Sequence, residues 1–342
     1  ERALEARPDY AEAHNNLGVA LDYLGRFAEA IGHYRQAVAI NPDNFSARVN
    51  LGIALLRSGA TDKGIESLRD AQQLKPTDLA VLDRLAAAGR FDPSLAAMVA
   101  DDIAAFHLQA EHRSDHGGFA DTQWVIRGNA AGLTEYGHDF LEASQCHQAA
   151  EESTRELARQ AERLDRRRAR GFVRQCHGDL HLGNIVLLNG RPTLFDAVEF
   201  NDALSCIDVF YDLSFLLMDM WRRRLHRQAN LVLNRYVART EDVDGLCLLP
   251  LFLSCRAAVR AKTSATSAVT LTDKAHREDL HALAQEYLEL SLQLLKPSPA
   301  LLVAIGGFSG SGKSTLAAGV APYLGTVPGA IVLRSDEIRK RQ

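Results

Sequence analysis

The sequence predicts a mainly helical protein: a short solenoid of paired helices, a helical lobe that carries one β-hairpin, and a strand–loop–helix segment of α/β type. Three observations lead to this prediction. Residues 11–78 repeat with a period of 34, apolar residues at helical spacing dominate between 79 and 295, and a glycine-rich loop at 306–315 stands between an apolar run and a helix-forming run. The predicted parts are residues 1–78, 79–298 and 299–342.

The chain's composition is that of an ordinary globular protein. Its 342 residues are 46% hydrophobic and 24% charged, enough for about two domains with a real core. The net charge of −4 gives no electrostatic case for a nucleic-acid partner, and we expect the arginine runs 166–168 and 222–224 to be solvated.

The apolar and cysteine patterns suggest a cytoplasmic protein. The apolar stretch at 246–255 is half of the ~20 residues that a membrane-spanning helix needs, so we expect a core helix and no membrane partner. Five cysteines without a CxxC pair favour a reducing compartment. Because the chain opens in mid-pattern without methionine, we expect Glu1 to be an internal residue of a longer chain.

The first part aligns with itself without a gap, residues 11–44 on 45–78. Small residues let two antiparallel helices approach closely, a glycine forms the turn between them, and a proline ends the second helix. The superposed pairs are Leu17/Leu51, Gly18/Gly52, Ala20/Ala54, Leu21/Leu55, Gly25/Gly59, Ile31/Ile65, Ala37/Ala71 and Pro42/Pro76. This is the tetratricopeptide pattern. It predicts a concave face for a protein partner, with the alternative that the helices only cap the rest of the chain.

The next segment predicts further helices. Asp92 and Pro93 form a helix start signal, a long polar helix is expected near 141–169, and helical spacing returns between 200 and 295 before a linker at 296–299. His112 and His116 have helical metal-ligand spacing without a third ligand nearby, which makes a metal site there a weak hypothesis.

The densest chemistry lies at 175–200. The strand-like runs 185–188 and 192–195 flank Asn189–Gly190, a strong hairpin signal because both turn residues must accept positive φ. A two-residue loop sets Leu188 opposite Arg191 and Asn184 opposite Phe195. Asn184 and Asp196 therefore emerge side by side at the open end of the hairpin.

Asp179 lies five residues before Asn184. Two carboxylates and an amide form a set of hard oxygen ligands that suits Mg²⁺ carrying phosphates. In phosphoryl transfer, one carboxylate can accept a hydroxyl proton while the amide and the other carboxylate hold the metal.

The segment resembles the aminoglycoside phosphotransferase and choline kinase group, because "HGDLHLGN" matches the HxDxxxxN loop of that group and "LFDAVEF" its metal-binding aspartate. The resemblance implies a protein-kinase-like C-terminal lobe in which Asp179 is the catalytic base, His177 orients the loop, and Asn184 and Asp196 are metal ligands. It also implies ATP and Mg²⁺ as cofactors and a hydroxylated small molecule as acceptor. From about residue 81 to the end, the chain looks like two-part bacterial proteins that join such a domain to a P-loop kinase-like ATPase domain.

In that group's pattern, Asp208 and Asp212 in "CIDVFYDLSFLL" would buttress the loop.

The chain departs from the family's pattern on its N-terminal side. There is no lysine between Lys75 and Lys262 to hold nucleotide phosphates, and the repeats stand where a sheet-forming N-terminal lobe is expected. An arginine could replace the lysine, and an inactive lobe is the alternative. His177 and His181 also have zinc-ligand spacing, although the surrounding ligands are oxygen donors and favour the kinase-like interpretation.

The loop at 306–315 fits GxxxxGK[ST], which predicts a phosphate-binding loop with Lys313 on the terminal phosphates and Ser314 on Mg²⁺. The predicted nucleotide-binding residues are Gly307, Ser309, Gly310, Ser311, Gly312, Lys313, Ser314 and Thr315. A buried strand is expected at 300–305 and a second one ending at Ser335–Asp336, where the resemblance to small-molecule P-loop kinases assigns Asp336 to the acceptor. We expect this part to be the N-terminal fragment of a P-loop domain.

These observations favour an ATP-dependent phosphotransferase. The alternative is a tetratricopeptide scaffold with vestigial or incomplete nucleotide sites. A third interpretation places function in Lys313, as a P-loop ATPase whose kinase-like part is regulatory.

Overall fold

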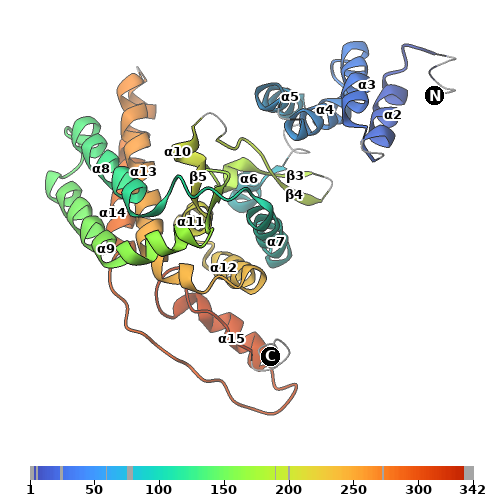
Figure 1. The fold of residues 1–342 in the computed structure, drawn as a ribbon. Helices are drawn as coiled ribbons and strands as arrows, with labels where there is room; N and C mark the ends of the chain where they lie inside the picture. Colours follow the sequence, from blue (N-terminus) through green and yellow to red (C-terminus); the bar gives the residue numbers. More distant parts are fainter. Residues whose placement is uncertain are drawn as a thin grey trace. The chain divides into compact units, whose positions relative to one another are not determined.

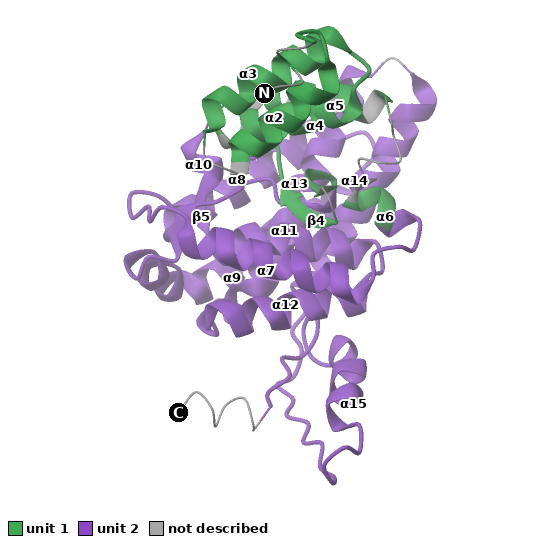
Figure 2. Ribbon diagram, turned by 90° about the vertical axis from the view of Figure 1, so that its right-hand side faces the viewer, with its two compact units in different colours: residues 1–85, 183–196 green, residues 86–182, 197–342 purple. Residues whose placement is uncertain are grey.

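The protein is mainly helical, and its described residues form two small antiparallel sheets (Figure 1). The computed structural model describes residues 4, 7–23, 26–58, 60–74, 80–188, 190–198, 201–271 and 273–334. The chain divides into two compact units, residues 1–85 with 183–196 and residues 86–182 with 197–342 (Figure 2). Among the described helices, none combines the length and the apolarity needed to cross a membrane.

The smaller unit contains the repeats as two helix pairs, α2 (Ala11–Tyr23) with α3 (Phe27–Ile40) and α4 (Phe45–Arg57) with α5 (Thr61–Leu74). Gly18 and Gly52 allow the close approach within each pair. A Cβ at Gly18 would lie 2.6 Å from the Tyr34 ring, and one at Gly52 would lie 2.6 Å from Leu68. The paired helices and the close approach at Gly18 and Gly52 are therefore as the sequence predicted. The predicted turn glycines, Gly25 and Gly59, and the helix-ending Pro76 lie outside the described residues.

A three-stranded sheet completes this unit in the order β1-β3-β4, with β1 at Ala80–Val81, β3 at Ile185–Leu188 and β4 at Arg191–Leu194. The short β1 falls in a region expected to be wholly helical, directly before α6 (Leu82–Ala87). Val186 and Phe195 of the hairpin region pack with Val49 and Leu68 of the second repeat. The hairpin and the repeats thus share one apolar core.

The larger unit is a helical lobe built around α11 (Val209–Arg222), which is buried along nearly its whole length, and α13 (Leu249–Thr270). A two-stranded sheet pairs β2 (Val173–Gln175) with β5 (Cys206–Asp208). The other elements are α7 (Pro93–Gln109), α8 (Gly118–Gly137), α9 (Ala143–Ala169), α10 (Asp202–Ser205), α12 (His226–Thr240), η2 (Asp244–Leu248) and α14 (Lys274–Leu294).

Local signals place several of these helices correctly. Asp92 caps α7, since its side chain accepts a hydrogen bond from the Leu95 amide at 2.9 Å, and Pro93 occupies the first turn. The long polar helix is α9. All five cysteines are free.

The last part differs from the prediction. The phosphate loop does lead into a helix, α15 (Lys313–Val320), followed by the short η3 (Ala321–Tyr323). The predicted strand at 300–305 is wrong, because these residues form no strand and Leu302 is 92% exposed. Residues 330–334 are not a strand either. A strand needs a neighbour for its backbone groups, and the described part of 299–334 supplies no paired strand.

Candidate active site

The loop at 176–182 is held by carboxylates of α11. Asp212 is fully buried and accepts hydrogen bonds from the backbone amides of His177 at 3.1 Å and Gly178 at 2.9 Å. Asp219, about two turns later on α11, accepts one from the Leu182 amide at 3.2 Å. The predicted buttressing role of Asp212 is therefore confirmed, and the loop has a fixed backbone.

Gly178 makes this loop geometry accessible. Its φ of 82° is left-handed, where a side chain is strained. A Cβ at Gly178 would also lie 2.9 Å from the Leu204 carbonyl oxygen and 3.0 Å from Val198 Cβ. Only glycine fits at this position without displacing its neighbours.

Arg256 of α13 also supports the loop. Its Nη1 donates to the Gly178 carbonyl and its Nε to the Tyr211 carbonyl, both at 3.1 Å. The guanidinium carbon lies 3.9 Å from the centre of the Tyr211 ring, and its Nη2 is 3.9 Å from Asp212 Oδ1. A buried cation thus lies directly beneath the loop that carries Asp179.

Asp179 projects from this loop with 41% of its side chain exposed, 3.5 Å from His181 Nε2. Burial of the carboxyl opposes its ionisation, but the hydrogen bond to His181 and the charges of Arg256 and Arg260 outweigh this effect. The pKa of Asp179 consequently lies below its ordinary value. A carboxylate that is ionised and partly exposed at neutral pH can accept a hydrogen bond from a hydroxyl group or bind a cation.

The hairpin places Asn184 and Asp196 as predicted. Leu188 pairs with Arg191 and Ile185 with Leu194, and the Phe195 amide donates to the Asn184 carbonyl at 3.1 Å. Gly190 has the positive φ expected of the turn, at 76°, whereas Asn189 lies outside the described residues. The two candidate metal ligands therefore come from the same open end of one hairpin.

Asp196 has a left-handed backbone, with φ at 62°. Such a conformation is uncommon outside glycine, although aspartate and asparagine tolerate it best. Residues held in sparsely populated conformations occur often at functional sites. Nothing in the sequence pattern signalled this feature of Asp196.

The four central residues divide between the two units. His177 and Asp179 belong to the larger unit, and Asn184 and Asp196 to the smaller one. Their convergence on a common ion stays a prediction.

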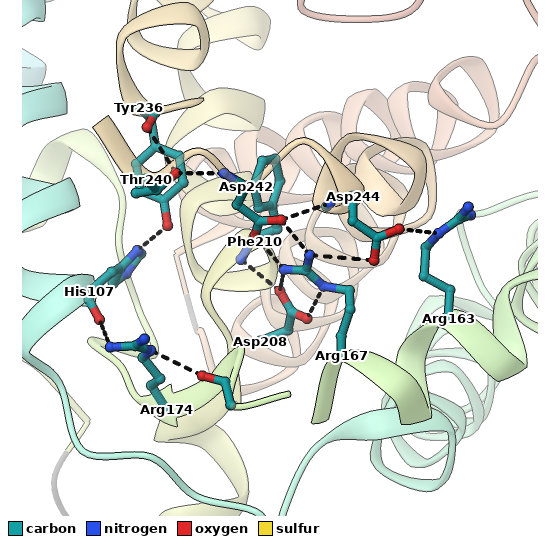
Figure 3. Close-up of polar contacts among 12 residues, drawn as sticks. His107, Arg163, Arg167, Arg174, Asp208, Phe210, Tyr236, Thr240, Asp242 and Asp244 are labelled. Carbon is teal, nitrogen blue, oxygen red and sulfur yellow. Dashed lines mark hydrogen bonds and ion pairs between the residues drawn. The ribbon is translucent and has the colours of Figure 1, made fainter. Parts of the chain in front are cut away.

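A second polar group lies behind the loop, formed by His107, Cys176 and Asp212 (Figure 3 shows His107 and its neighbours). His107 contacts the Tyr236 hydroxyl at 2.8 Å through Nδ1 and Asp212 at 3.1 Å through Nε2. Burial raises the pKa of the Cys176 thiol well above its ordinary value, which disfavours the thiolate that a metal would bind. With both ring nitrogens of His107 engaged, this group is better described as a hydrogen-bond network than as a metal site.

Arg167 is fully buried, which corrects the prediction that the run 166–168 is solvated. Its guanidinium makes two hydrogen bonds each to Asp208 and Asp242, at 2.6 to 3.0 Å (Figure 3). Burial opposes its charge, but the two carboxylates outweigh this and keep the pKa of Arg167 above its ordinary value. Asp208 thus anchors Arg167 and caps α11, which corrects the expectation that it buttresses the loop at 176–182.

The sequence contains a weak signal that Arg167 is buried. Arg167 lies three residues after Leu164 and ten after Leu157, both buried, and so shares the apolar face of α9. The charge run masked that spacing.

The candidate phosphate loop is exposed. Gly310 and Gly312 have positive φ, at 78° and 81°, and Gly312 directly precedes α15. Lys313 Nζ donates to the carbonyls of Gly307, at 2.7 Å, and Phe308. Lys313 and Ser314 also line a cleft of about 630 Å³ whose other walls are mostly apolar, including Leu233 and Leu249.

The other predicted nucleotide-binding residues belong to this loop or to the first turn of α15. Exposed side chains are those of Ser309, Ser311, Ser314 and Thr315. Asp336, the predicted acceptor residue, lies outside the described residues.

Comparison with known proteins identifies the first repeat. The tetratricopeptide repeat family matches residues 11–44. The chain is also 32% identical over 171 residues to uncharacterized proteins of Mycobacterium bovis and Mycobacterium tuberculosis, an alignment that covers 50% of this chain and 32% of each relative. The chain thus spans about a third of the length of the curated relatives it matches.

Proposed function

We propose that this chain combines a protein-interaction scaffold with an ATP-dependent phosphotransferase site. The tetratricopeptide repeat supports the interaction role, since these repeats are binding scaffolds. In the proposed site Asp179 accepts the proton of a hydroxyl acceptor and His177 orients the loop. Asn184 and Asp196 would hold Mg²⁺, which would neutralise charge on the transferred phosphoryl group.

The observation that carries the phosphotransferase proposal is the construction of the loop at 176–182. Two buried carboxylates accept hydrogen bonds from three of its backbone amides, and Arg256 donates one to its Gly178 carbonyl. These contacts fix the backbone of the loop, so that Asp179 is partly exposed and positioned to accept a hydrogen bond from a hydroxyl acceptor. The hairpin register and the left-handed Asp196 add support for the metal ligands.

Arg256 supplies a fixed positive charge near Asp179. This charge does not replace the missing lysine, which would hold nucleotide phosphates. We do not assign Arg256 a direct phosphate contact, because its two bonded nitrogens face backbone carbonyls.

The second candidate is a scaffold whose nucleotide sites are incomplete. It is favoured by the packing of the hairpin against the second repeat, because this gives the hairpin a structural role without any catalysis. In that case Asn184 and Asp196 would close a hydrogen-bonded turn.

Calorimetric titration of the whole chain with ATP and Mg²⁺ tests these alternatives. We expect Asp196→Asn, which keeps a residue that tolerates left-handed φ, to weaken binding at least about tenfold. Glu241→Gln is the matched control, since Glu241 is another acidic residue with left-handed φ, at 57°, and ends α12. Lys313→Met tests the phosphate loop separately.

Each outcome selects one interpretation. Loss of binding in Asp196→Asn alone supports the phosphotransferase site, and loss in Lys313→Met alone moves nucleotide binding to the phosphate loop. Absence of ATP binding in the parent chain would support the second candidate, a scaffold with incomplete nucleotide sites.

A further inference from the structure

Two asparagines of α12 bind the backbone that follows η3. Asn234 Nδ2 donates to the Ala330 carbonyl at 3.1 Å, and Asn234 Oδ1 accepts a hydrogen bond from the Val332 amide at 2.7 Å. Asn230, one turn earlier, donates to the same Ala330 carbonyl at 3.0 Å. Both partners belong to the larger unit.

The side-chain amide of Asn234 bonds to residues 330–332 in the way that a peptide group of a neighbouring strand would. In an extended chain, the carbonyl of one residue and the amide two residues later face the same edge. A primary amide offers one acceptor and two donors, so Asn234 can occupy the place of a neighbouring peptide group. Recognition of this kind reads the backbone rather than the side chains of residues 330–332.

Features of both α12 and the bound segment favour this contact. Asn230 is only 4% exposed, so its polar amide needs a partner at this place. Gly329, with φ at 115°, lets the chain approach: a Cβ there would lie 2.9 Å from Asn230 Nδ2 and 2.3 Å from the Ala321 carbonyl oxygen. The Ala330 amide then donates to that Ala321 carbonyl at 2.8 Å.

We propose that the asparagine pair Asn230–Asn234 is a docking site for the extended backbone of residues 330–332, which attaches the phosphate-loop segment to the helical lobe. Contacts between α12 and η3 extend the same attachment. This inference goes beyond the proposed function, because it requires neither nucleotide site to be active. It implies that one edge of residues 330–332 is occupied by α12.

Amide-resolved hydrogen exchange on the whole chain tests the docking site. Asn234→Ala removes both hydrogen bonds to residues 330–332, together with the hydrogen bonds of Asn234 Nδ2 to Asn230, and it places the best helix former in α12. We expect the Val332 amide to exchange about tenfold faster in this variant, with α12 itself still protected. Arg227→Gln, an exposed change on the same helix, is the control and should leave Val332 unchanged.

Asn234→Asp sharpens the test, because the carboxylate still accepts from the Val332 amide but no longer donates to Ala330. We expect protection of Val332 to survive in Asn234→Asp and to be lost in Asn234→Ala. Equal protection of Val332 in the parent and in Asn234→Ala, with α12 intact in both, would overturn the proposal.

Discussion

The larger unit contains two loops that the sequence associates with phosphate chemistry, and they are built in opposite ways. The loop at 176–182 is held from outside by Asp212, Asp219 and Arg256, which arrive from distant helices. The loop at 306–315 is held mostly from within, by Lys313 on its own carbonyls. The contrast shows that a loop can obtain its shape from tertiary contacts or from local backbone geometry, and that the two kinds respond differently to substitution.

The largest expected effect is at the buried ion pairs of Arg167 with Asp208 and Asp242. Arg167→Met should lower the free energy of unfolding by about 3 to 5 kcal/mol, because it leaves two buried carboxylates without their cation. Urea unfolding of the whole chain measures it. Arg166→Met, at a half-exposed neighbour, should change stability by less than about 0.5 kcal/mol. Similar values for both variants would refute the structural importance of the buried cation.

A matched glycine pair compares the two loops directly. Gly178 and Gly312 have nearly equal φ, 82° and 81°, but only Gly178 is closely surrounded. Gly178→Ala should cost about 3 kcal/mol from backbone strain and overlap, whereas Gly312→Ala should cost about 1 kcal/mol from strain alone. Thermal or urea unfolding distinguishes them, and equal costs would contradict the difference in construction.

Asp212→Asn is a milder change in the tertiary contacts that hold the loop at 176–182. Asparagine offers fewer acceptor sites to the His177 and Gly178 amides and brings an extra donor into a buried site, at a cost of about 1 to 3 kcal/mol. Faster hydrogen exchange at both amides is expected, while amides of 313–320 should keep the parent's exchange rates. A change confined to 313–320 would contradict this arrangement.

The smallest effect concerns surface charge. Hydrogen bonding to Arg235, aided by Arg239, lowers the pKa of Asp101 on α7 to about 2. A depressed pKa stabilises the fold above the ordinary carboxyl range and loses that contribution as pH falls through the folded pKa. With both arginines about half exposed, we expect less than about 1 kcal/mol. Asp101→Asn should therefore differ from the parent more at pH 6 than at pH 3, and the reverse trend would be inconsistent with the pairing.

Local sequence patterns were sufficient for the features that depend on neighbouring residues. The repeat period predicted two helix pairs, Asp92 predicted a helix start, and Asn189–Gly190 predicted a hairpin register that Leu188 and Arg191 follow. Each of these depends on periodicity or backbone dihedrals that a short segment fixes alone. The oxygen-ligand set of Asp179, Asn184 and Asp196 was likewise a prediction from spacing, and it stays one.

Tertiary structure decided the features that depend on partners far along the chain. Burial of Arg167 required Asp208 and Asp242, 41 and 75 residues away, and the charge run alone favoured solvent. The apolar run at 300–305 has the composition of a strand, yet a strand exists only when another backbone pairs with it. Likewise, nothing near Asn234 in the sequence identifies residues 330–332 as its ligand, because hydrogen-bond partners are chosen by the packing of the whole lobe.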